Sequence, residues 1–376
     1  NTSPYRNYRL YHYLYGIGLN IDEGILFIYI NLIRKFVFET LRAFADMGRT
    51  QGITTTGAII LIGALTSTAV LGWQHIVYIT IYSTVAHMAL NVYIAKGDTV
   101  LDSNTYVPSR NPVTEGVLSE KMAKNFVYGS IFFCMMWVLG LALFLDLFYV
   151  LLTLVCFIQS FLWLIWYGWK GKEYLISYDY SFSVSYAFTV LFGVFAIGGM
   201  PTTYTWIFIG IVIFAPTAFA QWENGFKDVN ADRSVGVKSL AVVTGVKNNK
   251  KISVTHPYFI YGLALKASFV IVCFLPYILS HNVYYLVFLL AYGIPSQAFV
   301  MYRFATKEKA IHHRKTILLD VTLSAILGFT AVVGKIGILW LFFVIGYLIV
   351  GYLVGSKVQS KCEFKFGRFK EQESGT

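Results

Sequence analysis

Long apolar stretches alternate with short polar ones along most of this chain. Each apolar stretch is close to the roughly 20 residues that a helix needs to cross a bilayer. A transmembrane β-barrel would instead show short segments of alternating hydrophobicity. The pattern predicts an all-α integral membrane protein, a helical bundle of nine to ten transmembrane helices around a central cavity. The expected helices cover residues 53–72, 75–95, 123–145, 147–167, 180–199, 203–222, 257–279, 283–303, 316–334 and 337–355.

The part of the chain before these helices has a different pattern. Residues 25–47 are apolar overall but include Arg34, Lys35, Glu39 and Arg42. A helix that spanned the bilayer here would bury two adjacent cations at its centre, which is costly. We therefore expect an amphipathic helix at the membrane interface. The chain then divides into an N-terminal segment (1–52), a transmembrane bundle (53–335), and an extra helix with a basic tail (336–376).

Composition and charge agree with a membrane protein and orient it. Charged residues make up only 13% of the chain, against about 25% in soluble domains. On alternate loops, together with the two terminal segments, lie 28 of the 30 Lys and Arg residues. The positive-inside rule makes those loops cytoplasmic, with the cell membrane as the expected location. The net charge of +11 then reflects topology and anionic membrane lipids, and we expect no nucleic-acid partner.

The four cysteines give no sign of a disulfide framework or a zinc site. Cys134, Cys156 and Cys273 lie within expected helices and Cys362 lies in the basic tail, without metal-ligand spacing.

Two pairs of carboxylates are the main clue to chemistry. The chain has only 19 Asp and Glu residues, yet Asp98 and Asp102 form one pair and Asp228 and Asp232 another. On a helix this i, i+4 spacing places both side chains of a pair on one face. Both pairs fall on the cytoplasmic side, in the loops after the second and sixth expected helices. Hard oxygen ligands at the mouth of a membrane bundle suit Mg²⁺ shared with a phosphate-bearing substrate.

The two pairs also indicate a weak internal repeat. Each pair follows two expected helices, and each is followed by a glycine and a new apolar stretch. Two pseudo-repeated halves, each with one acidic segment facing a shared cavity, would explain this pattern.

The second acidic segment resembles a known family signature. Asn224-x3-Asp228-x3-Asp232-Arg233-x2-Gly236-Val-Lys238-Ser-Leu-Ala-Val is similar to the second motif of the UbiA-type intramembrane prenyltransferases. The first motif is less regular, because Ala95 and Thr99 occupy the positions of the family's Asp residues after Asn91. Asp98 and Asp102 keep the spacing if three residues are inserted. The segment Ser109-Arg110-Asn111-Pro112-Val113 to Gly116 then resembles the family's Arg/Asn-Pro segment, and the resemblance spans roughly residues 40–335.

This resemblance implies a fold, a reaction and a set of site residues. The family is built from helical bundles, usually of nine spans, that move a polyprenyl group from its diphosphate to a small acceptor. Mg²⁺ ions clamp the departing diphosphate, and aromatic rings can stabilise the allylic cation. The implied catalytic and metal-binding carboxylates are Asp98, Asp102, Asp228 and Asp232, with Asn91 and Asn224 as further ligands. The implied diphosphate-binding cations are Arg110, Lys170, Lys172, Arg233 and Lys238, of which Lys170 and Lys172 follow Tyr167 at shifted spacing.

Several alternatives stay open on the sequence alone. The acceptor is expected to be an aromatic lipid-quinone precursor, with the glyceryl phosphate of archaeal ether lipids as the alternative. The irregular first motif and the extra helix also allow an inactive UbiA-like subunit of a membrane complex, and internal repeats occur in transporters. Lys266 and Asp320 lie within expected helices, where they could act in function, pair with each other or reach the interface. His87, one turn before Asn91, is interpreted as a packed helix residue.

Overall fold

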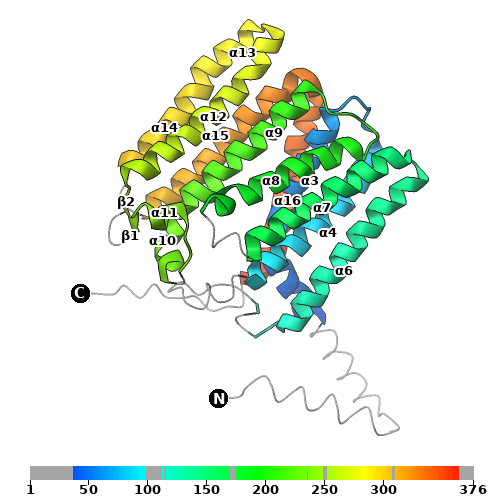
Figure 1. The fold of residues 1–376 in the computed structure, drawn as a ribbon. Helices are drawn as coiled ribbons and strands as arrows, with labels where there is room; N and C mark the ends of the chain where they lie inside the picture. Colours follow the sequence, from blue (N-terminus) through cyan, green and yellow to red (C-terminus); the bar gives the residue numbers. More distant parts are fainter. Residues whose placement is uncertain are drawn as a thin grey trace, which may run out of the picture. The chain divides into compact units, whose positions relative to one another are not determined.

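The structure, a computed structural model, describes residues 37–97, 112–113, 116–169, 175–234, 236–248, 252–306 and 310–363. All ten expected spans correspond to helices (Figure 1). The long helices are α3 (Ile53–Leu65), α4 (Trp73–Gly97), α6 (Glu120–Leu139), α7 (Leu147–Trp169), α8 (Leu175–Phe195), α9 (Thr203–Pro216), α12 (His256–Ser280), α14 (Ile294–Thr306), α15 (Ala310–Ile336) and α16 (Ile338–Glu363). Residues 37–47, on the expected interfacial helix, are also helical.

Shorter elements connect or extend these helices. Two are π-helical segments, η4 (Thr217–Glu223) and η5 (Leu289–Gly293). The others are η1 (Thr50–Gly52), η2 (Gly140–Leu143), α10 (Asn224–Ser234), α11 (Leu240–Val243), α13 (Val283–Phe288), and the antiparallel strands β1 (Lys247–Asn248) and β2 (Ile252–Ser253).

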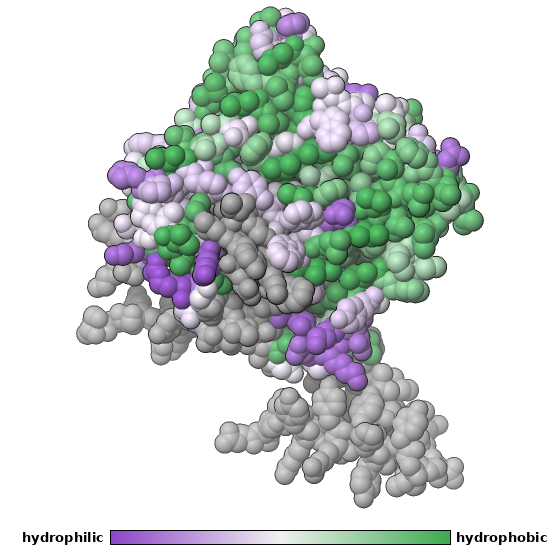
Figure 2. All heavy atoms as spheres, in the orientation of Figure 1, coloured by the Kyte–Doolittle hydropathy of each residue, from purple (hydrophilic) through white to green (hydrophobic). Residues whose placement is uncertain are grey.

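Within the described residues, eight helices are long and apolar enough to cross a membrane, and α3 and Tyr180–Phe195 are shorter apolar helices. The first expected span is too long, because α3 ends at Leu65 and Thr66 and Ser67 turn the chain. Large apolar side chains point outward at helical spacing, as Tyr128, Phe132 and Met136 do on α6. Hydrophobic residues accordingly cover much of the face in Figure 2. This exposed apolar surface is the surface expected of a protein solvated by lipid.

Helix α3 lies between two cores. Its buried side chains divide between a cluster with α4, α6, α7 and α8 and a second cluster with α9, α12, α15 and α16. Helices α3 and α8 cross at two glycines. A Cβ added at Gly193 would lie 2.1 Å from the Ile60 carbonyl oxygen, and one added at Gly63 would lie 2.3 Å from the Val190 carbonyl oxygen. Such close backbone approach is characteristic of helix pairs in membranes, where small residues form the interface.

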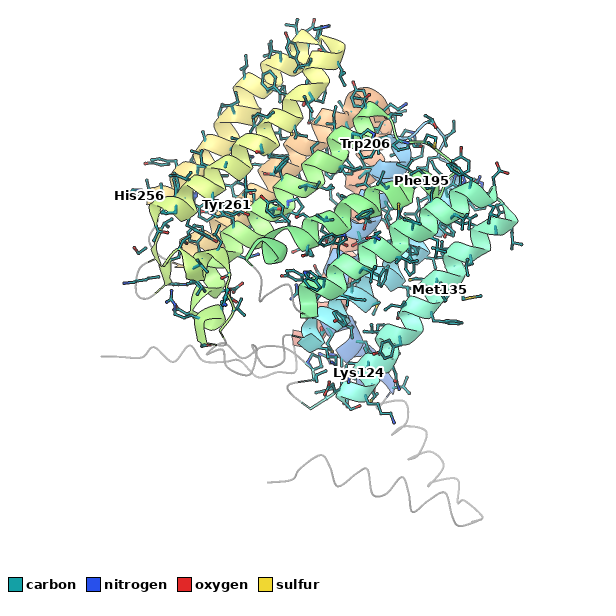
Figure 3. All side chains as sticks on the ribbon, in the orientation of Figure 1. Lys124, Met135, Phe195, Trp206, His256 and Tyr261 are labelled. Atoms are coloured by element: carbon teal, nitrogen blue, oxygen red, sulfur yellow. The ribbon has the colours of Figure 1, made fainter. Side chains whose placement is uncertain are left out.

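Contacts of α3 define the two ends of the bundle. Thr202 and Thr205, at the start of α9, donate hydrogen bonds to the Thr66 carbonyl oxygen, just past the end of α3. Phe195 and Trp206 are labelled near this α8–α9 connection in Figure 3. The chain then returns along α9, so η4 and α10 lie toward the end of the bundle where α3 begins. We call this the acidic end, because α10 carries the second pair of carboxylates.

The glycine crossing gives a test of the fold. Gly193→Ala should lower the thermal stability of the purified protein in detergent, because the new methyl group meets backbone that cannot rotate away. Overpacking of this kind costs roughly 1–3 kcal/mol. Gly129→Ala on α6 is the matched control, since nothing lies within 4 Å of its added Cβ. Equal melting temperatures for the two variants would contradict the proposed crossing.

Candidate functional site

The second acidic segment is helical, not the loop that we expected. Helix α9 continues through the π-helical segment η4 into α10 without a break, so the expected span 203–222 extends to Ser234. Asn224, Asp228 and Asp232 follow one another at four-residue spacing on α10, and therefore lie along one face. Asn224 and Asp228 are half-buried and Asp232 is 3% exposed. The acidic pair therefore lies on a helix that continues from the transmembrane helix α9.

The glycine and serine of this motif have a clear structural role. Gly236 adopts a left-handed conformation with φ of 76°, and the Val237 N–H donates to the Asp232 carbonyl oxygen at 2.9 Å. This is the Schellman arrangement that ends many helices, and glycine adopts it without strain. The turn brings Ser239 back toward α10, where its Oγ donates to Asp232 Oδ2 at 2.9 Å. Gly236 and Ser239 together hold the last carboxylate of the motif.

The two cations that follow this pair behave differently. Arg233 Nη2 donates to the Val246 carbonyl oxygen at 2.9 Å, which links α10 to the chain just before β1. Lys238 lies in the turn after Gly236 with an exposed side chain. Both therefore lie at the acidic end, beside the carboxylates that they follow in sequence.

Asn91 of the first motif also lies at the acidic end. It donates through Nδ2 to the His87 carbonyl oxygen at 2.9 Å. His87 is buried, with Nδ1 2.9 Å from Thr56 Oγ1 on α3 and Nε2 3.2 Å from the Arg49 carbonyl oxygen. The expectation that His87 is a packed residue is confirmed. Arg49, exposed and left-handed with φ of 46°, is a cation here that sequence reasoning missed, because no motif marks it.

The remaining site residues from the sequence lie outside the described residues: Asp98, Asp102, Arg110, Lys170 and Lys172. The helices that flank the first acidic pair come together, since Lys96 Nζ on α4 lies 3.1 Å from Glu120 Oε1 on α6. In the described part of the chain, no three His, Cys, Asp or Glu side chains gather as a metal site. The candidate metal ligands that the structure describes in the second motif are all amide or carboxylate oxygens, the ligand atoms that Mg²⁺ prefers. These residues fit the metal that the motif implies.

A buried charge cluster lies next to α10. Lys266 on α12 forms ion pairs with Asp320 on α15 and with Glu223, where Nζ lies 3.1 Å from Oε1. The exposed fraction of each of the three residues is 2% or less. Of the alternatives open for Lys266 and Asp320, mutual pairing is therefore what the structure shows. Sequence reasoning missed Glu223; its signal was an acidic residue at the end of an apolar stretch.

An apolar pocket runs through the second half of the bundle toward the acidic end. Its volume is about 710 Å³, and its walls come from α3, α9, η4, α15 and α16. At the acidic end it is lined by Thr54, Phe219 and Tyr352, and deeper in the bundle by Ile62 and Leu341. Ser324 also lines it, and this serine donates to Asp320 Oδ1 at 3.2 Å. The pocket therefore adjoins the buried charge cluster.

Comparison with solved structures places this fold. The chain is similar to a digeranylgeranylglyceryl phosphate synthase, with a TM-score of 0.60 and 19% identity over 79% of this chain and 99% of that one. It is similar to a UbiA homolog from Aeropyrum pernix K1, with a TM-score of 0.58 and 15% identity over 75% of this chain and 96% of that one. For a UbiA homolog from Archaeoglobus fulgidus bound to DMAPP and Mg²⁺, the TM-score is 0.56 and the identity 11%, over 77% and 99% of the two chains.

Sequence comparison agrees with this fold. No curated protein sequence matches the chain significantly. The family model of the UbiA prenyltransferase family matches residues 53–319, which include α3 to α14, both acidic pairs and the start of α15. This chain is a member of the UbiA prenyltransferase family, and is a helical membrane prenyltransferase.

Proposed function

We propose that this enzyme uses Mg²⁺ to transfer a polyprenyl group from its diphosphate to a small acceptor at the acidic end of the bundle. The observation that carries the proposal is that Asn224, Asp228 and Asp232 share one face of α10, a helix that follows directly on η4, whose Phe219 lines an apolar pocket. The similar structures from Archaeoglobus fulgidus, bound to Mg²⁺ with DMAPP or with GPP, support it.

Each polar residue has a role in this proposal. Asn91, Asn224 and the carboxylates Asp98, Asp102, Asp228 and Asp232 would hold Mg²⁺, which neutralises the charge that develops on the diphosphate as its C–O bond breaks. Arg233 and Lys238 bind diphosphate oxygens, with Arg110, Lys170 and Lys172 as further cations. Ser239 fixes the orientation of the Asp232 carboxylate, as the hydrogen-bond partners of metal ligands commonly do.

The apolar pocket is the proposed site of the polyprenyl chain. Its lining is almost entirely apolar, which suits a hydrocarbon and keeps water away from a reactive allylic cation. Helix α16 supplies one wall of the pocket through Ile345 and Leu348, and this helix lies beyond the residues that the family model matches. The extra C-terminal helix therefore has a role in shaping the hydrocarbon site.

The acceptor is proposed to be an aromatic precursor of a lipid quinone, on the form of the Arg110-Asn111-Pro112-Val113 segment. The glyceryl phosphate of ether lipids is the second candidate, supported by the similarity to digeranylgeranylglyceryl phosphate synthase. The two differ in charge, because a glyceryl phosphate brings an additional phosphate that needs its own cations. Lipids of the surrounding cell membrane are the other partners, and the acidic end is proposed to face the cytoplasm.

One prediction of the proposed function concerns the acidic helix. Purified enzyme given geranylgeranyl diphosphate and a panel of both acceptor classes should release diphosphate only with Mg²⁺, and EDTA should abolish release reversibly. Asp228→Ala should lower kcat/KM at least about 100-fold, as the loss of a group that stabilises the leaving charge does. Ser239→Ala should weaken the response to Mg²⁺ by about 10–100-fold, because Asp232 loses its hydrogen-bond donor.

Asp146→Ala is the control for these variants. This exposed carboxylate lies at the other end of the bundle, between α6 and α7, and its loss should leave turnover unchanged. Metal-dependent binding of the diphosphate without turnover on any acceptor would indicate that the acceptor is missing from the panel. Absence of binding would refute the prenyltransfer proposal and favour transport.

Another prediction of the proposed function concerns the apolar pocket. Ala325→Phe should fill part of its volume, so the ratio of kcat/KM for geranylgeranyl diphosphate to that for dimethylallyl diphosphate should fall at least about tenfold, because an occluded site can reject a long chain while accepting a short one. Ala264→Phe on the exposed face of α12 is the matched control and should not alter the ratio. If both variants retain the ratio of the parent enzyme, the chain binds elsewhere.

A further inference from the structure

The π-helical segment before the acidic helix is held by one face of α12. Tyr258, Gly262 and Lys266 recur at four-residue spacing, so they share a face of that helix. Trp222 packs directly on Gly262, where an added Cβ would lie 2.0 Å from its ring. Trp222 Nε1 donates to the Tyr258 carbonyl oxygen at 2.9 Å, and the Tyr258 hydroxyl donates to the Trp222 carbonyl oxygen at 2.6 Å. Two consecutive turns of α12, at Tyr258 and Gly262, therefore contact Trp222.

The third turn of this face of α12 carries the positively charged Lys266. Lys266 Nζ lies 3.1 Å from Oε1 of Glu223, the last residue of the π-helical segment and the neighbour of Asn224. On the other side of Lys266, Asp320 accepts from Nζ and from Ser324 Oγ, and Gln297 Nε2 donates to the same serine at 3.3 Å. Glu223 is completely buried, and the groups that interact with its carboxylate are the Lys266 ammonium and the Asp320 carboxyl group. Lys266 is therefore the cation that holds the Glu223 carboxylate beside Asp320.

The rotation of α10 depends on this fixed point. In a regular helix each residue turns the chain by about 100°, so a π-helical segment that relaxed to α-helix by one residue would turn α10 by that amount. Asn224, Asp228 and Asp232 would then face another direction. A π-helical segment is rare, and the ion pair joins its last residue directly to α12.

We propose that Glu223 and Lys266 are positioning residues: their buried ion pair sets the rotation of α10 and so aims Asn224 and Asp228 at the diphosphate. This inference rests on the proposed function for the identity of the ligand. Asp320 has a different part, since it balances Lys266 from α15 and has no link to α10 through the chain. Removing Glu223 or Asp320 leaves a one-to-one pair in either case, but only the removal of Glu223 takes away the ion pair between α12 and the residue next to Asn224.

This difference gives a matched experiment. Glu223→Leu and Asp320→Leu each delete one carboxylate that pairs with Lys266. Binding of inorganic pyrophosphate and turnover are measured as functions of Mg²⁺ concentration, together with backbone amide exchange over residues 224–234 and the melting temperature. Glu223→Leu should raise the Mg²⁺ concentration for half-maximal binding at least tenfold and speed amide exchange in α10. Asp320→Leu should change both by less than twofold, and Glu223→Gln should restore the parent behaviour because its amide oxygen still accepts from Lys266.

The other outcomes are equally informative. Equal effects of the two Leu variants, or a lower melting temperature with an unchanged Mg²⁺ response, would overturn the positioning role. If Glu223→Leu does not fold, the fully apolar variant Glu223→Leu/Lys266→Met/Asp320→Leu replaces it, because exchanging a whole buried charge cluster for apolar residues often preserves folding. It should show the same weakened Mg²⁺ response and faster exchange. If the parent enzyme binds no pyrophosphate, the proposed function fails, whereas the exchange of α10 still decides whether the ion pair fixes that helix.

Discussion

The ion pairs of Lys266 determine how the second half of this bundle is assembled. An ammonium group buried among apolar helices cannot turn to water, so its counter-charges have to come from neighbouring helices. Asp320 comes from α15, and Glu223 from the helix that leads into α10. The three helices are therefore tied at one depth, next to the acidic motif. The Trp222–Tyr258 hydrogen bonds add a second attachment between η4 and α12.

The first half reaches the same end of the molecule by another route. His87 on α4 bonds to Thr56 on α3, and Asn91 bonds to His87, so the first motif begins at a residue that is anchored to α3. At its other end α3 receives the Thr202 and Thr205 hydrogen bonds that start α9. Helix α3 thus connects the two halves and helps to place their motifs at one end, although the sequence repeat that suggested two halves is weak.

The helices were predictable from the sequence because a span of lipid imposes one length on any apolar helix. That Asp228 and Asp232 share one face was predictable too, since they keep i, i+4 spacing and both lie on α10. The continuation of α9 into α10 was not. It depends on the π-helical segment, which exists through contacts with Tyr258, Gly262 and Lys266 on a helix distant in sequence. The role of Ser239 was not predictable either. The sequence shows it only as one position of the motif, whereas in the structure its hydroxyl donates a hydrogen bond to Asp232.

The use of charge at this position is itself informative. A buried ion pair is no more stabilising than well-packed apolar residues of similar volume, and is often less so. An apolar contact, however, tolerates small rotations, whereas an ammonium between two carboxylates distinguishes one helix register from its neighbours. The Trp222–Gly262 contact is of this apolar kind and packs η4 against α12. What Glu223 and Lys266 add is selection of one rotation of α10, which matters because the proposed metal ligands Asn224, Asp228 and Asp232 lie along one face of that helix.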